Sequence, residues 1–178
     1  KFNRVMIPDL KIEAPGGAKE VLLHTCCAPC SSAIVECLLR NGITPVIFYS
    51  NDNIFPQEEF GKRENECLRY ARSIGLEVVT DAYDHSRWRE AVTGLEDAPE
   101  RGARCLECFK YRLERAARYA SDHGYKVLST TLASSRWKRQ DQIDAAGEFA
   151  CSKVENVVWW DQNWRKGGLQ ERRNEIIK

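Results

Sequence analysis

The regular alternation of short apolar runs with longer amphipathic stretches constrains the fold most strongly. Apolar runs predict strands at 21–25, 46–49, 76–79, 125–130 and 156–160. Between them, apolar residues recur at helical spacing near 29–40, 56–74, 84–94, 105–122 and 138–150. Strands that alternate with helices are typical of βαβ units, in which helices cover a parallel sheet. The sequence therefore predicts one doubly wound α/β domain, Rossmann-like or HUP-like, with a mostly parallel five-stranded sheet and helices on both faces.

The length of the chain agrees with a single domain. A chain of 178 residues can bury roughly 70% of its unfolded surface in one core. We interpret 1–178 as one catalytic domain, in which 1–19 form an N-terminal extension before the first strand. No apolar run approaches the ~18–20 residues that span a bilayer, and the N-terminus lacks the apolar segment of a secretory signal. We therefore expect a cytoplasmic protein without a membrane partner.

Unusual residues gather where ligands bind in folds of this class. In open α/β sheets, ligands bind outside the carboxyl ends of the strands, where the strand order reverses. The segments expected there are 25–30, 50–55, 130–138 and 161–168. No glycine-rich phosphate-binding motif follows the first strand, which carries cysteines instead. ATP or NAD binding by that route is not expected. The net charge of +1 excludes a uniformly basic surface but not a local basic patch.

Two cysteine groups are the strongest chemical signal in the chain. Cys26, Cys27 and Cys30 follow the first predicted strand, and Cys105 and Cys108 lie at the start of a predicted helix. The i, i+3 spacing of the second pair places both thiols on one helical face. The amino terminus of a helix favours thiolates. Two thiolates from each group would suit either a structural zinc or an iron–sulfur cluster.

The other three cysteines have no motif around them. Cys37 and Cys67 fall on apolar helical stripes, where a free cysteine packs as a small hydrophobe. Cys151 lies alone at the end of a predicted helix, and we interpret it as structural too. Eight cysteines in 178 residues are fewer than the ~8–10% that indicates a disulfide scaffold.

The chain resembles the epoxyqueuosine reductases of the queuosine pathway that do not use cobalamin, a QueH-like family formerly described as a domain of unknown function. The resemblance extends from about residue 20 to about residue 170. The motifs that carry it are Leu22-Leu23-His24-Thr25-Cys26-Cys27-Ala28-Pro29-Cys30, Arg104-Cys105-x-x-Cys108-Phe109-x-x-Arg112-Leu113, Thr130-Thr131-Leu132-x-x-Ser135 and Lys166-Gly167-Gly168.

The resemblance implies an iron–sulfur reductase, which converts epoxyqueuosine at the anticodon of transfer RNA to queuosine with electrons from a donor that the sequence does not identify. It assigns Cys26, Cys27, Cys105 and Cys108 to a [4Fe-4S] cluster. A second, mononuclear iron is associated with the family, and Cys30 is the spare thiol that we expect first as its neighbour. Family members also continue to a Cys-x-Cys pair after the Gly-Gly segment, so we expect the native chain to continue past residue 178.

Removing an epoxide oxygen as water takes two electrons and two protons, so a proton donor or Lewis acid is needed. Cys30 and Asp52 are the predicted catalytic residues, and Asp52 would bind the second iron or relay a proton. The alternative is that Asp52 caps its turn. Basic and aromatic residues near strand ends could contact RNA, although such charges are more often merely solvated. The predicted substrate-binding residues are Asn51, Asn53, Thr130, Thr131, Ser135, Arg136, Lys138, Lys166, Gly167 and Gly168.

Two other classes of protein remain open from the residues alone. The cysteines could hold zinc in a nucleic-acid-binding domain without redox activity. They could also hold a cluster that only shuttles electrons, as in a small electron carrier. Metal analysis distinguishes the first alternative from the reductase, and an assay on transfer RNA distinguishes the second.

Overall fold

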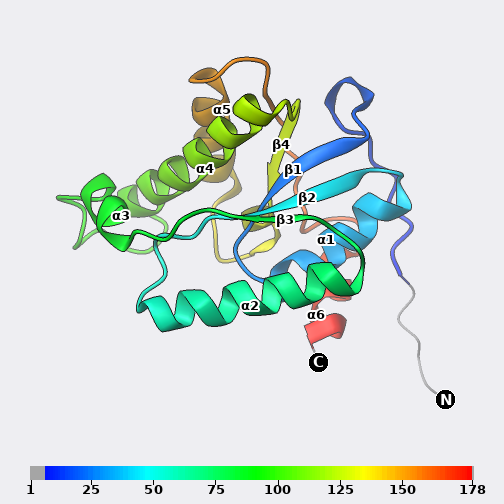
Figure 1. The fold of residues 1–178 in the computed structure, drawn as a ribbon, viewed down its shortest axis with the longest axis horizontal. Coiled ribbons are helices and arrows are strands. Elements are labelled where there is room, and N and C mark those ends of the chain that lie inside the picture. Colours follow the sequence, from blue (N-terminus) through cyan, green and yellow to red (C-terminus); the bar gives the residue numbers. More distant parts are fainter. Residues whose placement is uncertain (1–6, 178) are drawn as a thin grey trace.

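All five strands form one parallel sheet in the order β3-β2-β1-β4-β5 (Figure 1). This computed structural model describes residues 7–177. The predicted fold class is confirmed, and the sheet is parallel throughout. The strands are β1 (Glu20–Thr25), β2 (Thr44–Tyr49), β3 (Val78–Thr80), β4 (Val127–Thr130) and β5 (Val158–Trp159).

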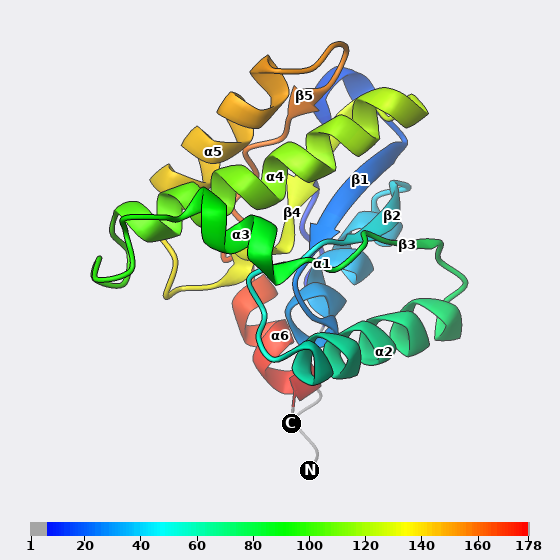
Figure 2. The same cartoon turned by 60° about the vertical axis from the view of Figure 1, so that its left-hand side comes forward.

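Helices cover both faces of the sheet. α1, α2 and α6 lie on one face, and α4 and α5 lie together on the other (Figures 1 and 2). No helix within residues 7–177 is long and apolar enough to cross a bilayer. The helices are α1 (Ala28–Arg40), α2 (Gln57–Ser73), α3 (His85–Ala91), α4 (Ala103–His123), α5 (Gln140–Ser152) and α6 (Leu169–Ile177), with two short 3₁₀ segments, η1 (Pro15–Gly17) and η2 (Thr131–Ser134).

Three strands begin later than the apolar pattern predicts, and local hydrogen bonds explain two of these differences. The Leu76 N–H donates to the Ala71 carbonyl at 2.9 Å, so it still closes the end of α2. The Tyr125 N–H donates to the Ala120 carbonyl at 2.9 Å, which closes α4 in the same way. Before β5, Asn156 has a left-handed backbone with φ 63°, a conformation that a strand does not allow.

The central strand β1 is almost completely buried because helices cover both of its faces. Val21, Leu22 and Leu23 have no exposed surface, in agreement with the continuous apolar runs of parallel strands. Cys37, Cys67 and Cys151 are buried as well, and the first two belong to the core of α1 and α2. The packing interpretation of these three cysteines is confirmed.

The strand order reverses between β1 and β4. The chain builds β1, β2 and β3 outward in one direction and then returns to place β4 on the other side of β1. Because every strand is parallel, all carboxyl ends open at one edge. The segments that follow β1, β2, β4 and β5 therefore meet there, as predicted, and this edge is the expected ligand site.

Gly147 is needed where α5 packs on the sheet. A Cβ at this position would lie 2.1 Å from the Trp159 ring, whereas a Cβ at Gly61 in α2 would meet nothing within 4 Å. Replacing a helical glycine by alanine otherwise stabilises by about 0.5–1 kcal/mol. We expect Gly147→Ala to lower the free energy of unfolding by about 1–3 kcal/mol and Gly61→Ala to raise it slightly. Urea denaturation checks both, and equal effects would contradict the packing argument.

Candidate metal centre and adjoining cavity

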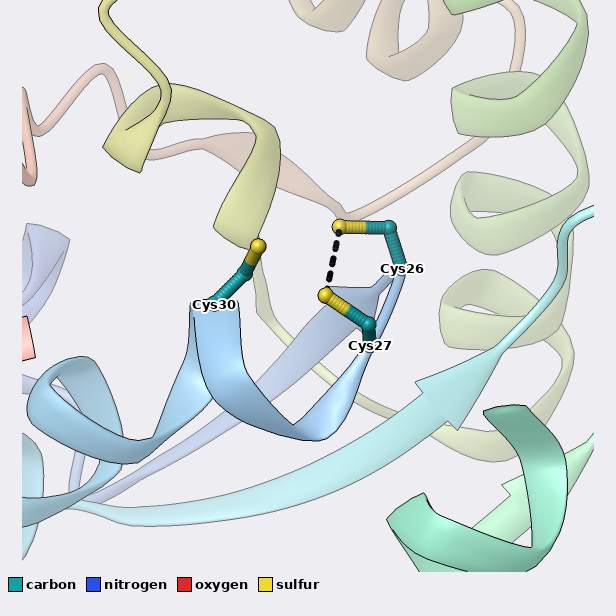
Figure 3. A group of neighbouring side chains, drawn as sticks. All are labelled: Cys26, Cys27 and Cys30. Carbon is teal, nitrogen blue, oxygen red and sulfur yellow. Dashed lines mark hydrogen bonds between the residues drawn. The ribbon is translucent and has the colours of Figure 1, made fainter. Parts of the chain in front are cut away.

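Three thiols converge at the junction of β1 and α1 (Figure 3). The sulfur atoms of Cys26, Cys27 and Cys30 all lie within 4.8 Å of one another, and Cys26 Sγ is 3.9 Å from Cys27 Sγ. Two thiolates on one tetrahedral metal, with metal–sulfur bonds of about 2.3 Å, lie about 3.8 Å apart. The spacing and the all-sulfur donor set therefore fit a thiolate-bound metal.

The backbone turn after β1 brings these thiols together. Cys27 is extended, with φ −165°, and caps the amino terminus of α1, whose first turn contains Pro29 and Cys30. The Cys26 N–H donates to Thr131 Oγ1 at 3.3 Å, and the same oxygen lies 3.6 Å from Cys26 Sγ. Thr131 begins η2 directly after β4, so both sides of the strand-order reversal contribute to the site.

The three thiols differ in pKa because they form hydrogen bonds with one another. Hydrogen bonds from the Cys27 and Cys30 thiols hold the pKa of Cys26 well below its usual value, and the positive charge of Arg112 adds to the effect. The hydrogen bond to Cys26 raises the pKa of Cys27, and it raises that of Cys30 to about 11. Cys26 is therefore the preferred thiolate of the group.

His24, two residues before Cys26 in the chain, connects the ends of three strands. Its Nε2 lies 2.9 Å from the Ser50 carbonyl, and its Nδ1 lies 2.9 Å from Thr130 Oγ1. A carbonyl can only accept, so Nε2 carries the proton and Nδ1 accepts from the Thr130 hydroxyl. The ring is completely buried, and burial together with the charge of Arg112 lowers its pKa to about 4. His24 is therefore neutral at physiological pH.

The buried neutral His24 predicts a pH dependence of stability. Its pKa is about 4 in the folded protein against 6.5 as the ordinary value, so unfolding takes up a proton between these pH values. The contribution of His24 is full above pH 6.5 and falls by about 3 kcal/mol as the pH drops to 4 and below. Urea denaturation of the metal-free protein at pH 7 and pH 4 measures it. A His24→Gln variant should lack this component, and an identical pH dependence in both proteins would contradict it.

Arg112 is a buried cation without a carboxylate partner. Its side chain on α4 is 4% exposed, and Nη2 donates to Asn51 Oδ1 at 2.6 Å. Within residues 7–177 no carboxylate oxygen lies within 4.0 Å of its guanidinium. Buried charges require an opposite charge, and Arg112 acts electrostatically on Cys26. A thiolate group is the negative charge that the site offers.

Cys105 and Cys108 lie in the wall of an adjacent cavity. They occupy the first turns of α4, and the Arg101 N–H donates to Cys105 Sγ at 3.4 Å. Neither sulfur lies within 4.8 Å of all three thiols of the β1–α1 group. The structure thus brings Cys26, Cys27 and Cys30 together in one group. Cys105 and Cys108 lie outside that group and line the cavity instead.

The cavity has a volume of about 210 Å³, and the charged residues of its lining are mostly cationic. Five of the lining residues are arginine or lysine, whereas Glu100 is the only lining residue with a carboxylate. Trp88, Phe109 and Trp137 add aromatic surface, and Trp137 is 72% exposed at the rim. Such a lining suits an anionic ligand that carries a planar ring. The cations are Arg101, Arg104, Arg112, Lys138 and Arg139.

The amino-acid sequence of this chain is similar to those of known proteins. The family model described as "Epoxyqueuosine reductase QueH" matches residues 21–178. The chain belongs to the QueH family. Similar relatives bearing that name come from Histophilus somni (44% identity, covering 94% of this chain and 69% of the relative), Acinetobacter baylyi (43%, 96% and 78%) and Thermotoga maritima (32%, 89% and 81%).

In this QueH-family chain, Asp52 and Asn51 are held by internal contacts. Asp52 is 1% exposed, and it accepts hydrogen bonds from the Tyr111 hydroxyl at 2.6 Å and from the Asp84 N–H at 2.9 Å. Arg87 lies 3.4 Å from the same carboxylate. Asn51 donates to the Thr25 carbonyl at 2.9 Å and accepts from Arg112. Both residues lie at the predicted edge of the sheet, and their predicted roles stay predictions.

Of the other predicted substrate-binding residues, only Asn53 and Lys138 line the cavity. Thr130 caps η2 and meets His24. Ser135 Oγ accepts from the Trp137 N–H at 3.3 Å. Arg136 lies over the Trp137 ring, with its guanidinium carbon 4.8 Å from the centroid, so the pair extends the cationic rim outward.

The Gly-Gly segment faces the N-terminal part of the chain. Gly167 and Gly168 have φ of 68° and 87°, and a Cβ on Gly167 would lie 2.7 Å from Leu10. A Cβ on Gly168 would lie 3.3 Å from Pro8. The segment that approaches these two glycines closely is therefore the N-terminal part of the same chain. Lys166, which precedes them, is exposed.

Sequence reasoning missed three residues of this region. Arg112 belongs to the second cysteine motif, but the motif does not show that its side chain is buried. That burial depends on how α4 crosses the sheet. Arg173 on α6 belongs to none of the motifs, yet its Nη2 lies 4.0 Å from Cys30 Sγ. Gln142 on α5 lines the cavity, and no local pattern sets it apart from an ordinary polar helical residue.

Proposed function

We propose that this chain is an iron–sulfur-dependent reductase that converts epoxyqueuosine in transfer RNA to queuosine. The observation that supports the proposal most is the convergence of three thiols at the strand-order reversal, beside a cationic cavity. The names of the relatives supply the reaction. The thiol group fits a metal, and the cavity fits a base with phosphates around it.

The reaction removes the epoxide oxygen as water and therefore takes two electrons and two protons. A [4Fe-4S] cluster, when bound, would deliver electrons one at a time from an external donor. We assign Cys26, Cys27, Cys105 and Cys108 to it, which requires both the β1–α1 turn and the first turns of α4. The role of this chain is to hold these thiolates beside the substrate, with Arg112 compensating their charge.

Cys30 and Asp52 are proposed to act on the epoxide oxygen. Cys30 is the third thiol of the β1–α1 group, so it is available to a second, mononuclear iron when the other two hold the cluster. Asp52 would bind that iron or pass a proton, with Tyr111 donating to its carboxylate. Full turnover and full metal content in Asp52→Ala would refute this role.

The cationic rim supports transfer RNA as the substrate. Arg101, Lys138 and Arg139 can neutralise phosphates, and the exposed Trp137 offers a ring on which an unpaired base can stack. Binding through phosphates weakens steeply as salt increases. Unpaired thiols persist in a reducing compartment, and all eight cysteines are unpaired, so the proposal includes a cytoplasmic location.

The decisive experiment is an anaerobic assay on transfer RNA bearing epoxyqueuosine, with nucleoside mass spectrometry as the readout. The proposal requires conversion to queuosine with a chemical reductant, together with iron and sulfide in the purified protein. One zinc per chain in a colourless anaerobic preparation would instead support a nucleic-acid-binding domain. A bound cluster without conversion would support an electron carrier.

A further inference from the structure

Four residues that line the cavity each carry a buried polar atom without a hydrogen-bond partner in the described part of the chain. These atoms are two acceptors, Gln142 Oε1 and Asn53 Oδ1, and two donors, Trp88 Nε1 and Arg112 Nε. A buried polar atom without a partner is unfavourable by about 1–3 kcal/mol. Four such atoms around one cavity of 210 Å³ indicate a ligand with both donors and acceptors.

Gln142 is the most sharply defined of these groups. It lies on α5 and is 8% exposed. Its Nε2 donates to the carbonyls of Arg101 and Gly102 at 2.9 Å and 3.2 Å. These two bonds fix the orientation of the amide, since only the nitrogen can donate to a carbonyl. Oε1 is therefore left as an acceptor without a partner, on a residue that lines the cavity.

A metal centre in the same region does not supply what Gln142 needs. Thiolates and inorganic sulfides accept hydrogen bonds, so they suit the Arg112 and Trp88 donors. They do not suit the acceptors of Gln142 and Asn53. The two acceptors need N–H or O–H groups from an organic ligand or from water.

We propose that Gln142 is a specificity-determining residue that accepts a hydrogen bond from the N–H edge of a guanine-type base in this cavity. The inference rests on the proposed function, because the base of epoxyqueuosine is a 7-deazaguanine. That base presents N1–H and an exocyclic amine as neighbouring donors, and its O6 is an acceptor for Trp88 or Arg112. An adenine-type base has an acceptor at N1, which would oppose the oxygen of Gln142.

Binding of free nucleosides to the metal-loaded protein tests this assignment without catalysis. The probes are 7-deazaguanosine, 7-deazaadenosine and 1-methylguanosine, and quenching of tryptophan fluorescence reports occupancy beside Trp88 and Trp137. The wild type should bind 7-deazaguanosine about tenfold or more tightly than either analogue, because each analogue leaves an acceptor unpaired. Gln142→Met should lose that preference.

Gln140→Met is the matched control. Gln140 is on the same helix but contacts Asp144 and Arg165 and does not line the cavity, so its loss should leave the preference unchanged. Thermal unfolding and metal content verify that each variant is intact. If Gln142→Met does not fold, equal affinity of the wild type for the three nucleosides still overturns the assignment.

Two results would overturn the assignment. One is equal affinity of the wild type for all three nucleosides, or no binding of any of them. The other is a preference that Gln142→Met retains in full, which would leave only water as the partner of Oε1. Conversion of epoxyqueuosine without base preference would refute the role of Gln142 and support the proposed reductase function. Base preference without conversion would support the role of Gln142 and refute the reductase function.

Discussion

Replacing Cys26 by serine is expected to remove most of the bound metal and to reduce epoxyqueuosine turnover at least about a hundredfold. Loss of groups that only orient a ligand already lowers affinity or activity by about 10–100-fold, and Cys26 is itself a proposed ligand. It is also the thiol that the structure favours as a thiolate. Metal analysis, visible absorption and the anaerobic assay measure the effect.

Cys151→Ala is the control for this prediction. Cys151 is buried on α5, outside the three-thiol group, so its removal should leave metal content unchanged and lower stability only slightly. Cys108→Ser and Cys30→Ser separate two possible ligand sets. Loss of the cluster in the first variant alone supports the assignment to both cysteine motifs. Loss in the second alone would show that the β1–α1 group binds the cluster without α4.

Replacing Arg112 by methionine is expected to weaken metal retention about a hundredfold or more, with a parallel loss of turnover. Arg112 is buried without a carboxylate, and the thiolates beside it would lose their compensating charge. Removing one partner of a buried charge pair is unfavourable by about 3–5 kcal/mol. Competition with a chelator measures the metal affinity.

Arg118→Met on the exposed side of α4 is the matched control, and it should retain metal as the wild type does. The metal-free proteins provide the discriminating measurement. If Arg112 compensates thiolate charge, Arg112→Met destabilises the metal-loaded protein far more than the metal-free one. Equal destabilisation of both forms would show that its bond to Asn51 is what matters.

Local patterns predicted the architecture because the longer elements, such as β1, β2, α1 and α4, show their own periodicity, and because the short strands β3 and β5 overlap apolar runs. The apolar run Val21–Leu23 is buried on both faces, and α1 begins at Ala28, one residue before the helical pattern predicted over 29–40. The strand-order reversal followed from the fold class, so the cysteines at its edge were predictable too. The ends of the strands and helices were less predictable from the sequence. Hydrogen bonds such as that from the Leu76 N–H to the Ala71 carbonyl continue a helical turn into an apolar run.

The detailed arrangement of the site depends on contacts between distant segments. Gln142 meets Arg101 and Gly102 some 40 residues away in the chain, and no spacing rule predicts such a pair. The i, i+3 rule predicted a shared face for Cys105 and Cys108, but a shared face does not specify the distance from that face to Cys26. That distance depends on how α4 packs against the sheet.

The two hydrogen bonds of His24 bear on how the protein acquires its metal. Its ring joins the ends of β1, β2 and β4 through protein groups alone, so the end of β1, which the three thiols follow, is positioned by the fold. Zinc fingers, by contrast, fold only when metal binds. We therefore expect metal to enter an already folded chain, and we expect a chain that has lost its metal to take it up again without refolding.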